Sequence, residues 1–114
     1  MTINRDDFPK DDDGEVLYNL SKKGVDLQQK RFIEFTCYVQ DEQQGVVVGN
    51  DLHGYGYETS IFSDLKAGKS NVVSLYIGIF MMPKHALIVL EQERINIILE
   101  PYGTKCDGWV TQSC

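Results

Sequence analysis

The sequence predicts a single domain of the α+β class, in which helices pack against one antiparallel β-sheet. Residues 31–39 and 72–80 alternate apolar and polar side chains with a period of two, which is typical of half-buried strands. Residues 84–100 carry apolar side chains around most of a helical circumference, which indicates a deeply packed helix. A chain of 114 residues is long enough to bury one core around these elements without cross-links.

The first element is a helix over residues 12–23. Aspartates stand at its start, lysines stand in its last turn, and Gly24 follows, an arrangement that both the helix dipole and C-terminal capping favour. A strand over residues 31–39 comes next. Its predicted core face carries Ile33, Phe35, Cys37 and Val39, and its other face carries Phe32, Glu34, Thr36 and Tyr38. Cys37 is therefore interpreted as a small packing residue.

Residues 41–53 leave two structures open. Asp41 followed by Gln44 is typical of a helix-capping pair, whereas Gly45, Gly49 and three consecutive valines oppose a stable helix and favour a hairpin. The residues alone leave the choice between helix and hairpin open. If Gly45 has helical backbone angles, its replacement by alanine is expected to stabilise the fold by up to about 1 kcal/mol.

The remaining elements follow in order. Residues 57–62 alternate as a short strand, residues 64–71 form a polar turn, and residues 72–80 form the second clearly alternating strand. The long helix over residues 84–100 begins after one proline and ends before another, and residues 105–111 can form a last strand.

If residues 41–53 are helical, the order after the first helix is β-α-β-β-α-β, which is the ferredoxin-like arrangement with an extra N-terminal helix. Right-handed crossovers would place the two later helices on one face of the antiparallel sheet. The other face would carry several aromatic side chains, and we expect the N-terminal helix to cover it in part. These side chains are Phe32, Tyr38, Tyr76 and Phe80.

Charge is concentrated at the N-terminal end of the chain. The net charge is −6, and residues 1–15 contain six acidic but only two basic side chains. We expect residues 1–10 to form a flexible acidic segment and residues 11–114 to form the folded domain. An acidic surface disfavours direct binding of nucleic acid and can instead attract a basic protein. No apolar stretch is long enough to span a membrane and no basic-then-apolar leader opens the sequence, which predicts a cytoplasmic protein.

The sequence lacks the chemical motifs of enzymes. The three cysteines do not have metal-binding spacing, the two histidines stand apart, and no phosphate loop or nucleophile motif occurs. We therefore expect a non-catalytic protein with no cofactor and no bound metal. An RNA-recognition sheet stays open as an alternative, because such domains stack bases on strand aromatics, although the negative net charge disfavours it.

Short fragments along nearly the whole chain resemble one family. They are Phe8-Pro9, Asp11-Asp12-Asp13-Gly14, Val16-Leu17, Gly24-Val25-Asp26-Leu27, Gly56-Tyr57, Met81-x-Pro83, Tyr102-Gly103 and Asp107-Gly108-Trp109. In this order they are similar to the RraB family of bacterial ribonuclease E inhibitors. The resemblance implies a ferredoxin-like domain, and the β-α-β crossover of this fold requires a helix over residues 41–53. It also implies that the domain binds ribonuclease E in its non-catalytic scaffold region and lowers RNA turnover without chemistry. The alternative is an immunity protein that neutralises a cognate nuclease toxin, since such inhibitors are also small, acidic and cytoplasmic.

Five residues are the candidates for contact with a protein partner. Asp11, Asp12, Asp13 and Asp107 are expected to attract a basic surface, and Trp109 is expected to anchor it. Each residue also has a structural interpretation, because aspartate can cap a helix or a turn and tryptophan more often packs in a core.

Overall fold

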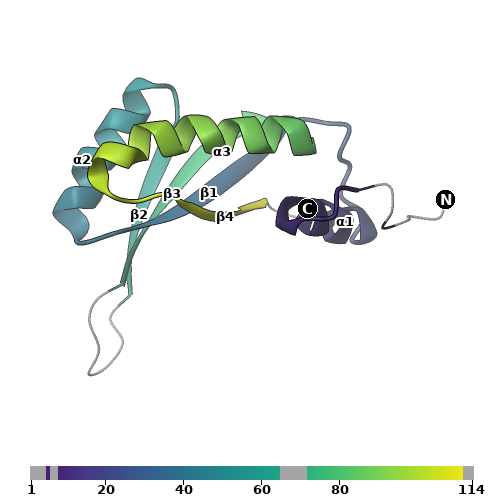
Figure 1. Ribbon diagram of the computed structural model, residues 1–114, viewed down its shortest axis with the longest axis horizontal. Coiled ribbons are helices and arrows are strands. Elements are labelled where there is room, and N and C mark those ends of the chain that lie inside the picture. The colour runs from purple at the N-terminus through teal and green to yellow at the C-terminus, as the bar shows by residue number, and fades with distance from the viewer. Residues whose placement is uncertain (1–4, 6–7, 65–71, 112–114) are drawn as a thin grey trace.

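The computed structural model describes Arg5 and residues 8–64 and 72–111, and this part of the chain contains three α-helices and a four-stranded antiparallel sheet (Figure 1). The predicted α+β class is therefore confirmed. In chain order the elements are α1 (Asp12–Lys22), β1 (Arg31–Val39), α2 (Glu42–Gly54), β2 (Glu58–Asp64), β3 (Val72–Met81), α3 (His85–Leu99), the 3-10 turn η2 (Glu100–Tyr102) and β4 (Cys106–Thr111). Each predicted helix and strand is present, and its ends differ from the prediction by at most two residues.

The sheet has the strand order β2-β3-β1-β4, and each neighbouring pair is antiparallel. In the central pair, Phe35 of β1 lies opposite Ile77 of β3, and Trp109 of β4 lies opposite Phe35 on the other side. Helices α2 and α3 lie on one face of the sheet (Figure 1). The core fills the space between these helices and the sheet; its fully buried side chains include Ile33, Phe35, Leu52, Leu75, Ile77, Ile88, Ile95 and Leu99.

Helix α2 forms although it contains several glycines. The Asp41 side chain accepts a hydrogen bond of 2.7 Å from a backbone N–H in the first turn, so the capping prediction is confirmed and the hairpin alternative is wrong. A Cβ atom at Gly45 would lie 3.2 Å from Ile61 Cδ1, and one at Gly49 would lie 3.0 Å from Thr59 Oγ1. The glycines therefore let α2 approach β2 closely, and this contact opposes the gain that helix propensity alone predicts for alanine.

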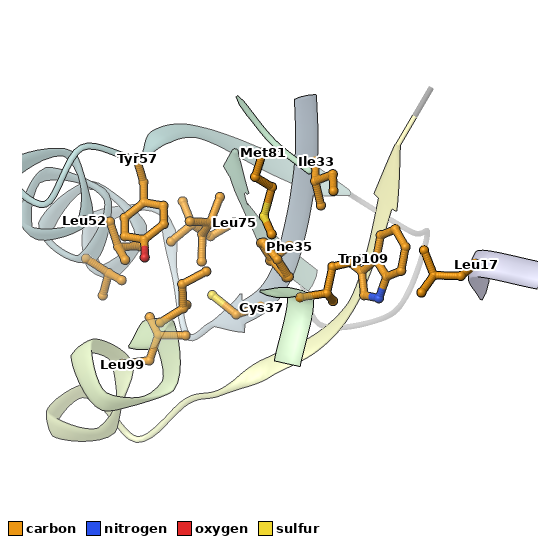
Figure 2. Packing of buried hydrophobic residues seen from close by; sticks show 14 of the residues in the cluster. Leu17, Ile33, Phe35, Cys37, Leu52, Tyr57, Leu75, Met81, Leu99 and Trp109 are labelled. Carbon is orange, nitrogen blue, oxygen red and sulfur yellow. The ribbon is translucent and has the colours of Figure 1, made fainter. Parts of the chain in front are cut away.

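Helix α1 lies beside α3 and the end of β4, and not over the open face of the sheet (Figure 1). Its buried Leu17 lies next to Trp109, as Figure 2 shows, and both side chains belong to the core. Since Trp109 is the strand partner of Phe35, its side chain points to the face that α3 covers. The expectation that α1 partly covers the opposite, aromatic face is wrong, because the apolar stripe of α1 is buried on this side instead.

The N-terminal segment contacts α1 where it is described. The ring centroid of Phe8 lies 5.8 Å from that of Tyr18, and Arg5 Nε donates to Glu15 Oε2 at 3.0 Å. Residues 1–4 and 6–7 of the segment predicted to be flexible, and nearly all of the turn predicted over residues 64–71, lie outside the described residues. Among the described residues, none of the helices combines the length and apolarity that crossing a membrane requires.

Candidate functional site

The open face of the sheet carries a group of exposed aromatic side chains. Alternation along the strands places six residues there, which we call the aromatic face: Phe32 and Tyr38 of β1, Phe62 of β2, Tyr76 and Phe80 of β3, and Val110 of β4. The exposed fractions are 40% for Phe32, 49% for Tyr38, 64% for Phe62, 62% for Phe80 and 54% for Val110. Exposed apolar surface gathered in this way is typical of a protein interaction site.

The strand register brings the rings of the aromatic face together. Phe32 and Phe80 are Cα partners in the β1–β3 ladder, and the ring of Phe62 meets that of Tyr76 edge-on with centroids 5.7 Å apart. Gly78 lies between these two pairs along β3. A Cβ atom at Gly78 would lie only 2.1 Å from Phe32 Cζ, so the far end of the Phe32 ring occupies the space above the glycine. The absence of a side chain at this position lets the ring lie across β3.

Two carboxylates share a row of the sheet with Gly78. Across the four strands, Glu58 of β2 is opposite Gly78, Gly78 is opposite Glu34 of β1, and Glu34 is opposite Val110 of β4. Strands spaced by about 4.8 Å place the two glutamate Cα atoms about 10 Å apart. Glu58 is exposed and Glu34 is half-buried. At the outward-pointing strand positions whose side chains the structure describes there is no Lys or Arg, so the charge within the aromatic face is acidic.

None of the residues of this surface was among the five sequence candidates for partner contact. The sequence placed Phe32, Glu34, Tyr38, Tyr76 and Phe80 on this side of the sheet but did not place Glu58, Phe62 and Val110 there. The period-two pattern of residues 57–62 places Glu58 and Phe62 on one side of their strand, but it does not reveal which strand is the neighbour or in which register. Only the ladder pairing shows that Glu58 and Glu34 flank the same glycine.

Asp11, one of the five candidates for partner contact, is held in internal contacts at the start of α1. It caps the helix by accepting a hydrogen bond of 2.7 Å from the backbone N–H of Gly14, and its other oxygen lies 2.7 Å from His85 Nε2. The Gly14 hydrogen bond, followed by that of His85, holds the pKa of Asp11 below its usual value. Asp11 therefore links the first turn of α1 to the first turn of α3.

Asp13 and Trp109 bind each other. Trp109 Nε1 donates to Asp13 Oδ1 at 2.9 Å, and Gln92 Nε2 of α3 donates to Asp13 Oδ2 at 3.1 Å. Trp109 is only 5% exposed and packs in the core, in agreement with its structural interpretation. Asp12 and Asp107 are exposed and lie outside these contacts. The structure thus brings Asp13 and Trp109 together as a tether of α1 and leaves Asp12 and Asp107 on the surface.

Residues 10–111 match the model of one protein family, described as regulator of ribonuclease activity B, or RraB. The chain belongs to the RraB family. The resemblance inferred from short fragments is thereby confirmed over nearly the whole chain. As the description states, the family regulates ribonuclease activity, which is the role of a regulator rather than of a catalyst. A comparison with individual curated proteins gave no match.

In this RraB-family chain, one buried polar contact joins α3 to the start of β2. Tyr57 Oη donates to Glu91 Oε1, and both residues are buried. Burial, followed by the hydrogen bond to Glu91, raises the pKa of Tyr57 above its usual value. The phenol therefore stays neutral and satisfies the carboxylate, which explains how a glutamate is accommodated in the core.

The two described cysteines of the RraB-family chain lie opposite each other on β1 and β4. Burial raises the pKa of Cys37 to about 11, and burial together with the neighbouring Cys37 raises the pKa of Cys106 to about 12. Neither thiol is therefore an activated nucleophile. In the part of the chain that the structure describes, no group of three or more His, Cys, Asp or Glu side chains is placed to hold a metal ion.

Proposed function

We propose that this protein regulates a ribonuclease in the bacterial cytoplasm by binding the enzyme or its scaffold region, without catalysis and without a cofactor. Membership of the RraB family supports regulation of ribonuclease activity. The observation that carries the binding mechanism is the aromatic face, which none of the three helices in the described part of the chain covers. Aromatic rings contribute much of the affinity at protein interfaces, because the partner removes a large apolar area from water.

The order of the elements supports a ferredoxin-like fold with α1 as an addition. After α1 the chain runs β1-α2-β2-β3-α3-β4, and β1 and β3 occupy the centre of the sheet. Two helices then share one face of the sheet, and the other face is available to a partner.

We assign the acidic side chains a role in the encounter with a basic partner. The net charge is −6, and Asp12 and Asp107 are exposed. Their contribution falls with salt, as the screening length decreases from about 10 Å at 0.1 M to about 3 Å at 1 M. Asp11, Asp13 and Trp109 act indirectly in this proposal, by holding α1 beside α3 and β4.

RNA binding by the sheet is the second candidate. Exposed rings on three neighbouring strands favour it, because RNA-recognition sheets stack bases on such rings. The carboxylates of Glu34 and Glu58 oppose it, because they repel the phosphates that would lie beside the bases. The balance of charge therefore favours a protein partner.

The test measures RNA cleavage by purified ribonuclease E that retains its scaffold region, with increasing amounts of the protein. Cleavage is expected to slow, and Phe62→Ala or Phe80→Ala should weaken the inhibition by about tenfold. Ile97→Ala is the matched control, because Ile97 is 70% exposed on α3, on the other side of the sheet. An unchanged cleavage rate with the protein in excess would refute the proposal. Binding of the RNA itself would favour the second candidate.

A further inference from the structure

The row formed by Glu58, Gly78 and Glu34 has the chemistry of a guanidinium site. The far end of the Phe32 ring lies above Gly78, and the two glutamates flank that glycine on the neighbouring strands. Phe80, the strand partner of Phe32, borders the row on one side. An exposed ring between two carboxylates offers a cation both a π face and negative charge.

Arginine fits this arrangement better than lysine or phosphate. A guanidinium is planar, so it can stack on a ring and bind a carboxylate through two parallel hydrogen bonds at the same time. A lysine ammonium is compact and strongly hydrated. It can lie over a ring, as Lys22 lies over Tyr18 at 5.0 Å from the ring centroid, but it can neither stack in plane nor form two parallel hydrogen bonds with a carboxylate. A phosphate would meet Glu34 and Glu58 with no described cationic side chain of the aromatic face to balance its charge.

We propose that the aromatic face binds an arginine-bearing segment of a protein partner, with one guanidinium seated over Phe32 between Glu34 and Glu58. Apolar side chains on either side of that arginine then cover the outer rings, Phe62 and Phe80, which are the more exposed ones. The inference rests on the proposed function, since it names what the aromatic face recognises in the ribonuclease or its scaffold.

The test measures fluorescence anisotropy of three labelled probes with the full chain. The probes are a short peptide in which arginine alternates with leucine, the same peptide with lysine in place of arginine, and a single-stranded RNA oligonucleotide. The arginine peptide should bind about tenfold more tightly than the lysine peptide, because only arginine combines stacking with a two-bond carboxylate contact. The RNA oligonucleotide should bind more weakly than either peptide.

Charge-neutral variants locate the site. Glu34→Gln combined with Glu58→Gln should weaken binding of the arginine peptide by about tenfold and leave the lysine peptide less affected. Glu93→Gln combined with Glu100→Gln is the matched control, because it makes the same change in net charge at exposed positions on the other side of the sheet. Gly78→Ala should displace the Phe32 ring and remove the preference for arginine. Circular dichroism confirms that each variant is folded.

Equal affinity for the two peptides, or equal losses in the paired variants and their controls, would overturn the inference. Tighter binding of the RNA oligonucleotide would overturn it as well. The outcome is separable from that of the proposed function. Arginine-selective binding without any effect on the ribonuclease would support the inference and refute the proposed function. Inhibition of the ribonuclease without arginine selectivity would support the proposed function and refute the inference.

Discussion

Asp13→Ala should lower the free energy of unfolding by about 2–3 kcal/mol. The substitution removes the hydrogen bonds from Trp109 Nε1 and Gln92 Nε2, of 2.9 and 3.1 Å. A hydrogen bond to a charged group contributes about 1.5–3 kcal/mol to stability. Because Asp13 is partly exposed, we expect its two hydrogen bonds together to contribute only about 2 kcal/mol. The loss of an acidic side chain from the first turn of α1 adds about 0.5 kcal/mol. For a domain of this size, the midpoint of thermal unfolding should fall by roughly 10 °C.

Urea denaturation of a double-mutant cycle isolates the contact between Asp13 and Trp109. Trp109→Phe keeps an aromatic ring in the core but removes the N–H donor. The coupling energy between Asp13→Ala and Trp109→Phe should be about 1 kcal/mol or more. Asp12→Ala is the control, because Asp12 is exposed in the same turn and carries the same charge. It should change the free energy of unfolding by at most about 0.5 kcal/mol.

The cycle also separates the two interpretations of these residues. Equal stability of Asp13→Ala and Asp12→Ala, together with a coupling energy near zero, would show that the Asp13 carboxylate does not hold α1 in place. If Asp13→Ala then weakened binding to the ribonuclease without loss of stability, the carboxylate would be a direct partner contact.

Three further predictions concern single side chains. Gly45→Ala should lower stability by about 1 kcal/mol, because its methyl group crowds β2. Gly54→Ala should not, because a Cβ atom there would have no neighbouring atom of another part of the fold within 4 Å. Urea denaturation of both variants checks this. Burial raises the pKa values of Cys37 and Cys106 to about 11 and about 12, so neither thiol should be alkylated at pH 8 until urea is added. Peptide mass mapping checks this, and modification of both thiols in the native protein would contradict it. Hydrogen bonds from the first turn of α1 and then from a histidine lower the pKa of Asp11, so its contribution to stability is present above about pH 4 and is lost as pH falls through the lowered pKa. The difference in unfolding midpoint between the native chain and Asp11→Asn should therefore shrink below about pH 4, and a constant difference would contradict the assignment.

The strands could be predicted from sequence because their local pattern and their tertiary role agree. Residues 31–39 alternate cleanly, and the structure buries one side of β1 and exposes the other. Helix α2 was ambiguous for the opposite reason. Gly45 and Gly49 lower helix propensity locally, but they are needed where α2 approaches β2, and this requirement is visible only when the partner strand is known.

The position of α1 could not be predicted, because its partners are remote in the sequence. The apolar stripe shows that one side of the helix is buried but does not show against what. The deciding contacts come from Trp109 and Gln92, which follow Asp13 by 96 and 79 residues. The acidic residues of the aromatic face were missed for a similar reason, since Glu34 and Glu58 become neighbours of Gly78 only through the strand register.

Stability and binding are assigned to opposite faces of the same two strands, so substitutions should separate them. Phe35 of β1 has no exposed surface, whereas Phe80 of β3 is 62% exposed. Only the area removed from water contributes to folding, at about 25 cal/mol per Å², so Phe80→Ala should cost at most about 1 kcal/mol of stability, against about 3–5 kcal/mol for Phe35→Ala. A partner would bury the remaining area of the Phe80 ring, so the same variant should lose affinity for the ribonuclease by about tenfold. Unfolding and inhibition should be measured on one preparation of Phe80→Ala. If the ring packs in the fold, the variant mainly loses stability; if the ring contacts the partner, the variant mainly loses affinity.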